Sequence, residues 1–403
     1  MRRILLVVAV LLVGVVGVTT VATASGPTVS GPTLFGTTLF GTTLSGPNLP
    51  VPVPVATASI VHVPALGATD VSPTAPATVS VTDGTLDEVT LTGPDGSEID
   101  GALDGATWTS AAPLAYDTTY TWGGTATGAD GKTVPVDGSF HTLAPADIVR
   151  GVLNIGDDRT VGIAAPIEVQ FDAHVEDRAA VERALSVETS VPVEGSWGWL
   201  PDENGGSRVH WRPAEYWPSG TTVTVEANLF GVAYGGGAYG KADVTSTFTI
   251  GRAQIVRADV NSHRMLVFRD GVQVADYPAS YGLSGDPERT TRSGVHVVSE
   301  KFTDKRMVSE RYGYDVMEKW AVRISNNGEF IHANPASSSA QGSSNVTHGC
   351  VNLSTSDAQA YYDTAIFGDP VEVTGTDVPL ASRDGDIWDW TLSYSEWQSL
   401  SAL

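Results

Sequence analysis

Short alternating strands separated by turn residues fill the stretch from Thr57 to Gly251, and this periodicity is the strongest constraint on the fold. Residues 77–81 alternate apolar and polar side chains before an Asp-Gly pair, and residues 167–171 repeat the pattern further on. Because side chains in a strand point to opposite faces in turn, alternation predicts strands with one buried face. The sequence therefore predicts antiparallel β-sandwiches here.

The two halves of this stretch predict two immunoglobulin-like domains, at residues 57–145 and 146–251, because strands and turns recur at the spacing typical of that sandwich. Residues 176–185 interrupt the second domain and predict a short helix. Four tryptophans in this domain are predicted to lie in its core: Trp197, Trp199, Trp211 and Trp217.

A third domain, at residues 252–375, is predicted to be mostly β as well. Residues 264–269 and 272–277 alternate around Asp270-Gly271, which favours a hairpin with a type I′ turn. Further strands are expected at 294–299, 320–324 and 329–331. The segment from Ser354 to Asp357 reads as a helix N-terminus, and the helix is expected to run to about residue 366. A tryptophan-bearing tail at residues 376–403 follows.

The N-terminus has the layout of a secretory signal peptide. Arg2 and Arg3 precede an apolar run at residues 4–18, and Ala22-Thr23-Ala24 follows it. We expect residues 1–24 to be a signal peptide or an N-terminal anchor, and residues 25–56, rich in Gly, Pro and Thr, to be a linker. The protein is thus expected to be exported, and to lie on the outer face of the cytoplasmic membrane if anchored.

Charge and cysteine content limit the partners. The net charge of −23 opposes binding of nucleic acid. A single cysteine forms no internal disulfide, and dispersed histidines give no zinc signature, so neither a metal nor another cofactor is expected. The sequence does not indicate an oligomeric state.

The single cysteine, Cys350, lies in Thr347-His348-Gly349-Cys350-Val351-Asn352, and His332 precedes this segment. A thiol reacts as its thiolate, so a nucleophilic cysteine needs a nearby base or cation. His332 closes a strand and is the better base, whereas His348 lies only two residues from the cysteine in a turn and is assigned a scaffolding or substrate-side role. The amides of Gly349 and Cys350 are candidate oxyanion donors. The alternative is an inert buried cysteine with two hydrogen-bonded histidines.

These residues resemble the L,D-transpeptidases with a YkuD-like catalytic domain, whose actinobacterial members carry a histidine, some fifteen residues, and then Ser/Thr-His-Gly-Cys-x-Asn. The architecture is similar too: a signal or anchor, two immunoglobulin-like domains, the catalytic domain, and a tryptophan-bearing tail that packs on the catalytic domain. Trp388, Trp390 and Trp397 match that tail.

The resemblance implies a peptidoglycan L,D-transpeptidase, a cysteine acyltransferase that joins donor and acceptor tetrapeptide stems by 3→3 cross-links and is acylated by carbapenems. Cys350 would be the nucleophile and His332 the base, oriented by the backbone carbonyl of Ala333. Tyr314 would help to form the oxyanion site. Substrate contacts are expected from Thr347, Gly349 and Asn352. A lid over the site is expected at residues 301–314.

Two other functions stay open at this point. With water in place of the acceptor amine, the same site would be an L,D-carboxypeptidase. A chain with an inactive catalytic domain would be a wall-binding or spacer protein, although the intact His332, His348, Gly349 and Cys350 argue against it. Papain-like peptidases place cysteine before histidine, and sortases need a downstream arginine on a strand, so both fit less well.

Overall fold

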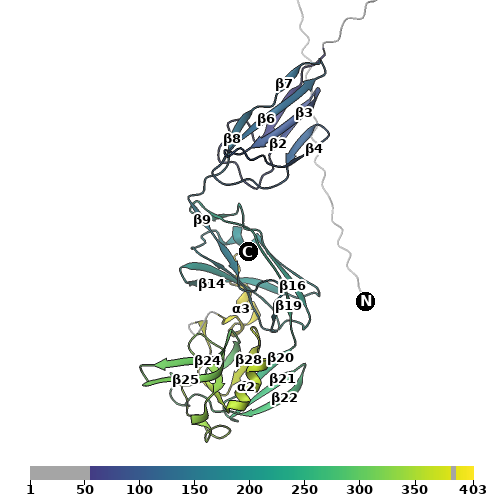
Figure 1. The fold of residues 1–403 in the computed structure, drawn as a ribbon. Coiled ribbons are helices and arrows are strands. Elements are labelled where there is room, and N and C mark those ends of the chain that lie inside the picture. Colours follow the sequence, from purple (N-terminus) through teal and green to yellow (C-terminus); the bar gives the residue numbers. More distant parts are fainter. Residues whose placement is uncertain (1–54, 383–386) are drawn as a thin grey trace, which may run out of the picture. The chain divides into compact units, whose positions relative to one another are not determined.

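The computed structural model describes residues 55–382 and 387–403, and most of its regular structure is strand (Figure 1). The predicted signal peptide and all but the last two residues of the predicted linker lie outside the described residues. Among the described residues, no helix combines the length and the apolar character needed to cross a bilayer.

The first domain is a sandwich of two four-stranded sheets. Trp108 and Trp122 meet edge to face at its centre, with ring centroids 5.6 Å apart, and Val79 and Phe140 lie beside them in the core. One sheet has the order β1 (Ser59–Val63), β2 (Thr78–Thr82), β5 (Thr107–Ser110), β4 (Gly101–Asp104); the other contains β3 (Gly84–Thr92), β6 (Thr119–Gly128), β7 (Thr133–Pro135) and β8 (Gly138–His141).

The second domain is also a sandwich, and the four predicted core tryptophans are all buried in it. The predicted helix at 176–185 is shorter than expected: α1 spans Arg178–Glu182, and Leu185 already begins a strand. One sheet has the order β10 (Gly151–Leu153), β12 (Ile167–Phe171), β15 (Gly206–Pro213), β14 (Gly195–Glu203). The sheet that faces it has the order β11 (Thr160–Val161), β19 (Val244–Ile250), β16 (Thr222–Ala227), β13 (Leu185–Thr189). A small third sheet has the order β17 (Ala233–Gly235), β18 (Ala238–Gly240), β9 (Asp147–Val149).

The third domain has two sheets and a helix. One sheet has the order β22 (Val272–Pro278), β21 (Arg264–Arg269), β20 (Gln254–Asp259), β28 (Pro370–Thr374), β23 (Gly294–Val297), and the other β24 (Glu300–Ser309), β25 (Tyr314–Arg323), β26 (Phe330–Ala333), β27 (Val351–Leu353). The predicted hairpin turn has φ of 49° at Asp270 and 78° at Gly271, both positive as a type I′ turn requires.

Helix α2 (Thr355–Thr364) begins where predicted, because the Ser354 hydroxyl accepts a hydrogen bond from the backbone of Asp357 at 3.1 Å. It packs on β25, β26 and β27. The predicted lid lies in a hairpin: residues 300–309 and 314–323 pair as one long antiparallel ladder, which projects from the domain in Figure 1.

Strand β25 contains a β-bulge beside β26. Val322 pairs with Ile331 but Lys319 pairs with Ala333, so β25 has one extra residue at this point. Trp320, inside the bulge, has φ of 55°, a left-handed conformation that is rare for a bulky side chain. Its ring lies 5.3 Å from that of Tyr362 on α2.

The C-terminal tail contacts the catalytic domain, where residues 389–391 lie against β23, and it also binds the second sandwich, a contact that the sequence did not indicate. Leu380 does pair with Ser293 of the catalytic domain. Beyond it, Trp397 is fully buried and donates to the carbonyl of Ser196 at 3.0 Å, and the Trp199 amide donates to the carbonyl of Leu400 at 2.9 Å. The tail contains η3 (Asp389–Thr391) and α3 (Tyr394–Gln398), and α3 lies beside β14 (Figure 1).

The tail binds the second sandwich because this sandwich carries a buried cation, the guanidinium of Arg212. Arg212 of β15 is fully buried, and its guanidinium lies 4.7 Å from the ring of Trp390 and 5.3 Å from that of Trp397. It also donates to the carbonyl of Leu392 at 3.0 Å. A buried guanidinium needs acceptors and aromatic faces around it, and the tail supplies them.

A second buried pair joins tail and sandwich. His210 Nδ1 lies 2.8 Å from Asp389 Oδ1, and both side chains are fully buried. Burial opposes a charge on His210, but Asp389 and then Glu168 more than offset this and raise the pKa of His210 from 6.5 to about 9. The stability that this pair contributes is therefore complete below pH 6.5 and is lost as the pH rises through about 9.

We accordingly predict that the free energy of unfolding falls by about 1–3 kcal/mol between pH 6.5 and 9.5, because the buried imidazolium loses its proton. Urea unfolding at both pH values measures this. The Asp389→Asn variant is less stable at pH 6.5 and should show a much flatter dependence. An equally steep dependence in that variant would assign the effect to another group.

Candidate active site

Two adjacent parallel strands bring His332 and Cys350 together. β26 pairs with β27 in the register Ile331 with Val351 and His332 with Asn352. Cys350 immediately precedes β27, two residues before Asn352, so it lies on the same side of the sheet as His332. The thiol is partly exposed, and its sulfur lies 3.5 Å from the carbonyl oxygen of Gly328.

The imidazole of His332 is oriented by the backbone. Its Nδ1 donates to the carbonyl oxygen of Ala333 at 2.9 Å, so Nε2 is the nitrogen left for the thiol. Because a carbonyl holds the ring, the alanine side chain at position 333 leaves the orientation unaffected. The ring is buried, which restricts its motion further.

The charge state of His332 is set by its neighbours. Burial alone would lower its pKa, but hydrogen bonding and charge interaction with Cys350 and with Glu318 outweigh burial and raise the pKa of His332 to about 10. An imidazolium at neutral pH beside a thiol favours the thiolate. The pair is therefore arranged to keep a proton on His332 beside the sulfur of Cys350.

Asn352 and Thr347 hold the cysteine loop in place. The side-chain nitrogen of Asn352 lies 2.8 Å from the Cys350 carbonyl oxygen and 2.8 Å from Thr347 Oγ1. Its side-chain oxygen accepts from the amide of Asn334 at 2.9 Å. Since these contacts occupy its side chain, Asn352 acts by fixing the loop, although it and Thr347 also line the cavity.

Gly349 has φ of 112°, a backbone conformation that a side chain would strain. Its carbonyl accepts from Thr291 Oγ1 at 2.8 Å. On the other side of the loop, Arg289 donates to the carbonyls of Val346 at 2.8 Å and Thr347 at 3.2 Å. The segment that precedes the cysteine is thus fixed by hydrogen bonds from Thr291 and Arg289.

His348 stands apart from the pair formed by His332 and Cys350. Its ring lies 4.5 Å from that of Tyr312 and 5.4 Å from that of Tyr314. Partial burial, and then the positive charge of Arg289, lower its pKa, so it is neutral at physiological pH. This agrees with a substrate-side or scaffolding position rather than with the base.

A cavity of about 220 Å³ opens over Cys350. It brings together most of the predicted site residues with some that the sequence did not indicate. Tyr314 lies on its wall, and burial and then the charge of Cys350 raise the pKa of this phenol, so it stays protonated. The lining consists of Met307, Tyr314, Val316, Glu318, His332, Asn334, Ala336, Thr347, His348, Cys350 and Asn352.

Of the lining residues that sequence reasoning missed, Glu318 is the one whose carboxylate approaches His332. Its Oε2 lies 3.7 Å from His332 Nδ1, and only 16% of its side chain is exposed. It stands fourteen positions before the histidine, in a strand rich in charges, and no motif marks it. Only knowledge of the bulge in β25 would place Glu318 beside His332.

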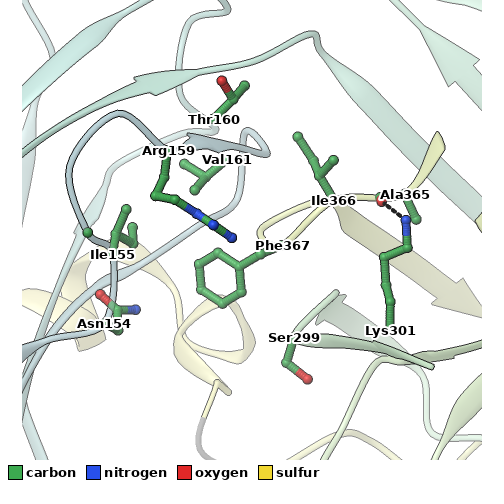
Figure 2. Close-up of a pocket in the computed structure, with 11 residues that line it drawn as sticks. Asn154, Ile155, Arg159, Thr160, Val161, Ser299, Lys301, Ala365, Ile366 and Phe367 are labelled. Atoms are coloured by element: carbon green, nitrogen blue, oxygen red, sulfur yellow. Dashed lines mark hydrogen bonds between the residues drawn. The ribbon is translucent and has the colours of Figure 1, made fainter. Parts of the chain in front are cut away.

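A second cavity, of about 600 Å³, is lined by different kinds of side chain. It lies between residues 154–161 of the second sandwich and the catalytic domain, and its cations are Arg159 and Lys301 (Figure 2). Lys301 donates to the carbonyl of Ala365 at 2.7 Å. No cysteine or histidine is among the lining residues of this cavity. No group of metal-ligating side chains occurs among the residues that the structure describes.

The family of the chain follows from comparison with known proteins. The YkuD model, described as an L,D-transpeptidase catalytic domain, matches residues 253–373, and a bacterial Ig domain model matches residues 68–233. L,D-transpeptidase 5 of Mycobacterium tuberculosis is 54% identical over 343 residues, which are 84% of this chain and 76% of that protein. L,D-transpeptidase 2 of the same species is 36% identical over 361 residues, 87% of this chain and 85% of that protein.

This chain belongs to the L,D-transpeptidase family, with immunoglobulin-like sandwiches ahead of a YkuD catalytic domain. Among solved structures, an L,D-transpeptidase in complex with imipenem is 32% identical and covers 57% of this chain and 100% of its own, with a TM-score of 0.48.

Proposed function

We propose that this protein forms 3→3 cross-links in peptidoglycan through a thioester on Cys350. The observation that carries the proposal is the pairing of a partly exposed thiol with a buried imidazole whose pKa is raised to about 10, in a cavity of an L,D-transpeptidase domain. An ion pair of this kind supplies a nucleophile and a proton donor at once.

In the first half-reaction the thiolate adds to the carbonyl carbon between diaminopimelate and the terminal D-Ala of a tetrapeptide stem. Tyr314 and the amides of Gly349 and Cys350 stabilise the oxyanion. The bond from carbon to nitrogen breaks, and the imidazolium of His332 gives its proton to the departing amine. D-Ala leaves, and the stem stays bound as a thioester.

In the second half-reaction the side-chain amine of another stem attacks the thioester. His332, now neutral, takes the proton from the amine, and Cys350 departs as thiolate. The product is a new amide between the two stems, and the site returns to its starting charge state. Water in the place of the amine would give a tripeptide instead.

A strained β-lactam carbonyl offers the same thiolate an electrophile, so we propose carbapenems as inhibitors that acylate Cys350. The expected result is a mass increase of one intact drug molecule per chain by mass spectrometry of the whole protein. A drug adduct on any other residue would contradict the assignment.

The deciding experiment mixes the purified protein with a disaccharide-tetrapeptide and separates the products by chromatography and mass spectrometry. Cross-linked dimer together with free D-Ala is the expected outcome. Tripeptide without dimer would replace the proposal with an L,D-carboxypeptidase, and an unchanged substrate would favour a wall-binding protein.

We also propose that the protein acts outside the cytoplasmic membrane, because its substrate is there and the sequence at residues 1–24 has the layout of an export signal. Fractionation of cells that produce the protein tests this. Recovery of the protein from the cytosol alone would overturn it.

A further inference from the structure

Glu318 faces His332 because of the bulge in β25. Val322 lies opposite Ile331, and if that register simply continued, Lys319 would lie opposite Asn334. Glu318 would then point away from the face that carries His332, since side chains alternate along a strand. The extra residue moves Lys319 opposite Ala333 and turns Glu318 onto the face of His332.

This arrangement is held against backbone strain. Trp320, inside the bulge, has φ of 55°, and no glycine relieves the conformation. Strained residues of this kind persist where the surrounding fold holds them, and they are concentrated at functional sites. The strain at Trp320 and the position of Glu318 are therefore two aspects of one feature.

The contact itself is electrostatic. Glu318 Oε2 lies 3.7 Å from His332 Nδ1, whose proton is already directed to the carbonyl of Ala333 at 2.9 Å. The exposed fractions of the two side chains are 16% and 4%, so water screens the carboxylate only weakly. A carboxylate at this distance stabilises the imidazolium without displacing the hydrogen bond that orients the ring.

We propose that Glu318 is a positioning residue that keeps His332 protonated beside Cys350 into the alkaline range. Its catalytic consequence rests on the proposed function, but its effect on His332 is measurable without substrate.

The other charged groups around His332 act elsewhere. Tyr314 and His348 share the cavity but do not contribute to the shift in His332, which comes from Cys350 and Glu318. Lys319 Nζ is held by Asp304 at 2.8 Å. On α2, which packs on β26, Asp363 acts on Lys301 and Asp357 on Tyr277. Glu318 is thus the carboxylate that matters for this imidazole.

The first test is titration of His332 by NMR with labelled histidine, in the wild type and in Glu318→Gln. The variant keeps the shape of the side chain and removes its charge. We expect the pKa of His332 to fall from about 10 by about one to two units, as the loss of an opposite charge at this range implies. Glu318→Asp should restore part of the difference.

The matched control is Asp315→Asn. Asp315 lies on the same strand, but its carboxylate is paired with Arg306 at 2.6 Å and is half exposed, so its loss should leave the titration of His332 unchanged. Equal titration curves for the wild type and Glu318→Gln would overturn the proposal.

The second test follows D-Ala release against pH. In Glu318→Gln the alkaline loss of kcat/KM should begin at a pH lower by the same amount, with less than about threefold change near pH 6.5, where His332 stays protonated in both proteins. Normal D-Ala release with failed cross-linking would instead show that Glu318 binds the acceptor amine, and would refute the proposed role. If the wild type releases no D-Ala, the proposed function fails while the NMR titration still decides the role of Glu318.

Discussion

Replacement of Cys350 by alanine should lower the rate of D-Ala release by at least about 10⁴-fold, as removal of a catalytic nucleophile does in other acyl-transfer enzymes. The chain contains one cysteine, so no second thiol can take over. His332 and Tyr314 remain in the variant, but without the sulfur no thioester forms. The measurement is D-Ala release from a tetrapeptide stem under conditions that saturate the wild type.

The fold should tolerate this change, because the thiol is partly exposed and its contact with the carbonyl of Gly328 is a long one, at 3.5 Å. Circular dichroism and the unfolding transition of the variant should match those of the wild type. The Cys350→Ala protein should also show no carbapenem adduct. Turnover at more than about one hundredth of the wild-type rate would sink the thioester mechanism, because the residual rate of a site without its nucleophile is far smaller.

Replacement of Trp397 by alanine should lower the free energy of unfolding by about 3–5 kcal/mol, the usual effect of emptying a fully buried tryptophan site. The indole is fully buried, donates to Ser196 and lies against the guanidinium of Arg212. Its fit is close: a Cβ built on Gly198 would come within 2.9 Å of the ring. The variant leaves both a cavity and an exposed cation.

Urea unfolding, followed in the transition of the second sandwich, measures this loss. Leu403→Ala is the control, because Leu403 is 66% exposed and its change should stay within about 0.5 kcal/mol. A loss below about 1 kcal/mol in Trp397→Ala would mean that the tail does not stabilise the sandwich. At low temperature the variant should retain D-Ala release, since the tail is not part of the cavity over Cys350.

The mostly β fold and the family could be predicted from the sequence because both rest on local signals. Alternation over five or six residues marks the strands, and the segment around Cys350 is contiguous. The turn at Asp270-Gly271 needs two residues with positive φ, and an Asp-Gly pair is the sequence signal for such a turn. Each of these features depends on neighbours in the chain.

The features that were missed depend on distant residues. Glu318 reaches His332 only through an extra residue in β25, and nothing in the local pattern of that strand distinguishes a bulge from regular pairing. The contact of the tail with the second sandwich was not expected, because it depends on Arg212, a residue type that normally lies at the surface but is buried here. The His210 and Asp389 pair joins positions 179 residues apart. Polar groups paired over such separations leave no periodicity to detect.

The attachment of the tail to β14 and β15 also orders events during synthesis. The second sandwich is complete only when residues 388–402 cover Leu200 and Arg212, and the whole catalytic domain is made in between. A growing chain thus carries an uncovered apolar patch, and a guanidinium without its aromatic neighbours, until residues 388–402 are made. Chains that stop before residue 388 expose that surface to any factor that binds exposed apolar segments.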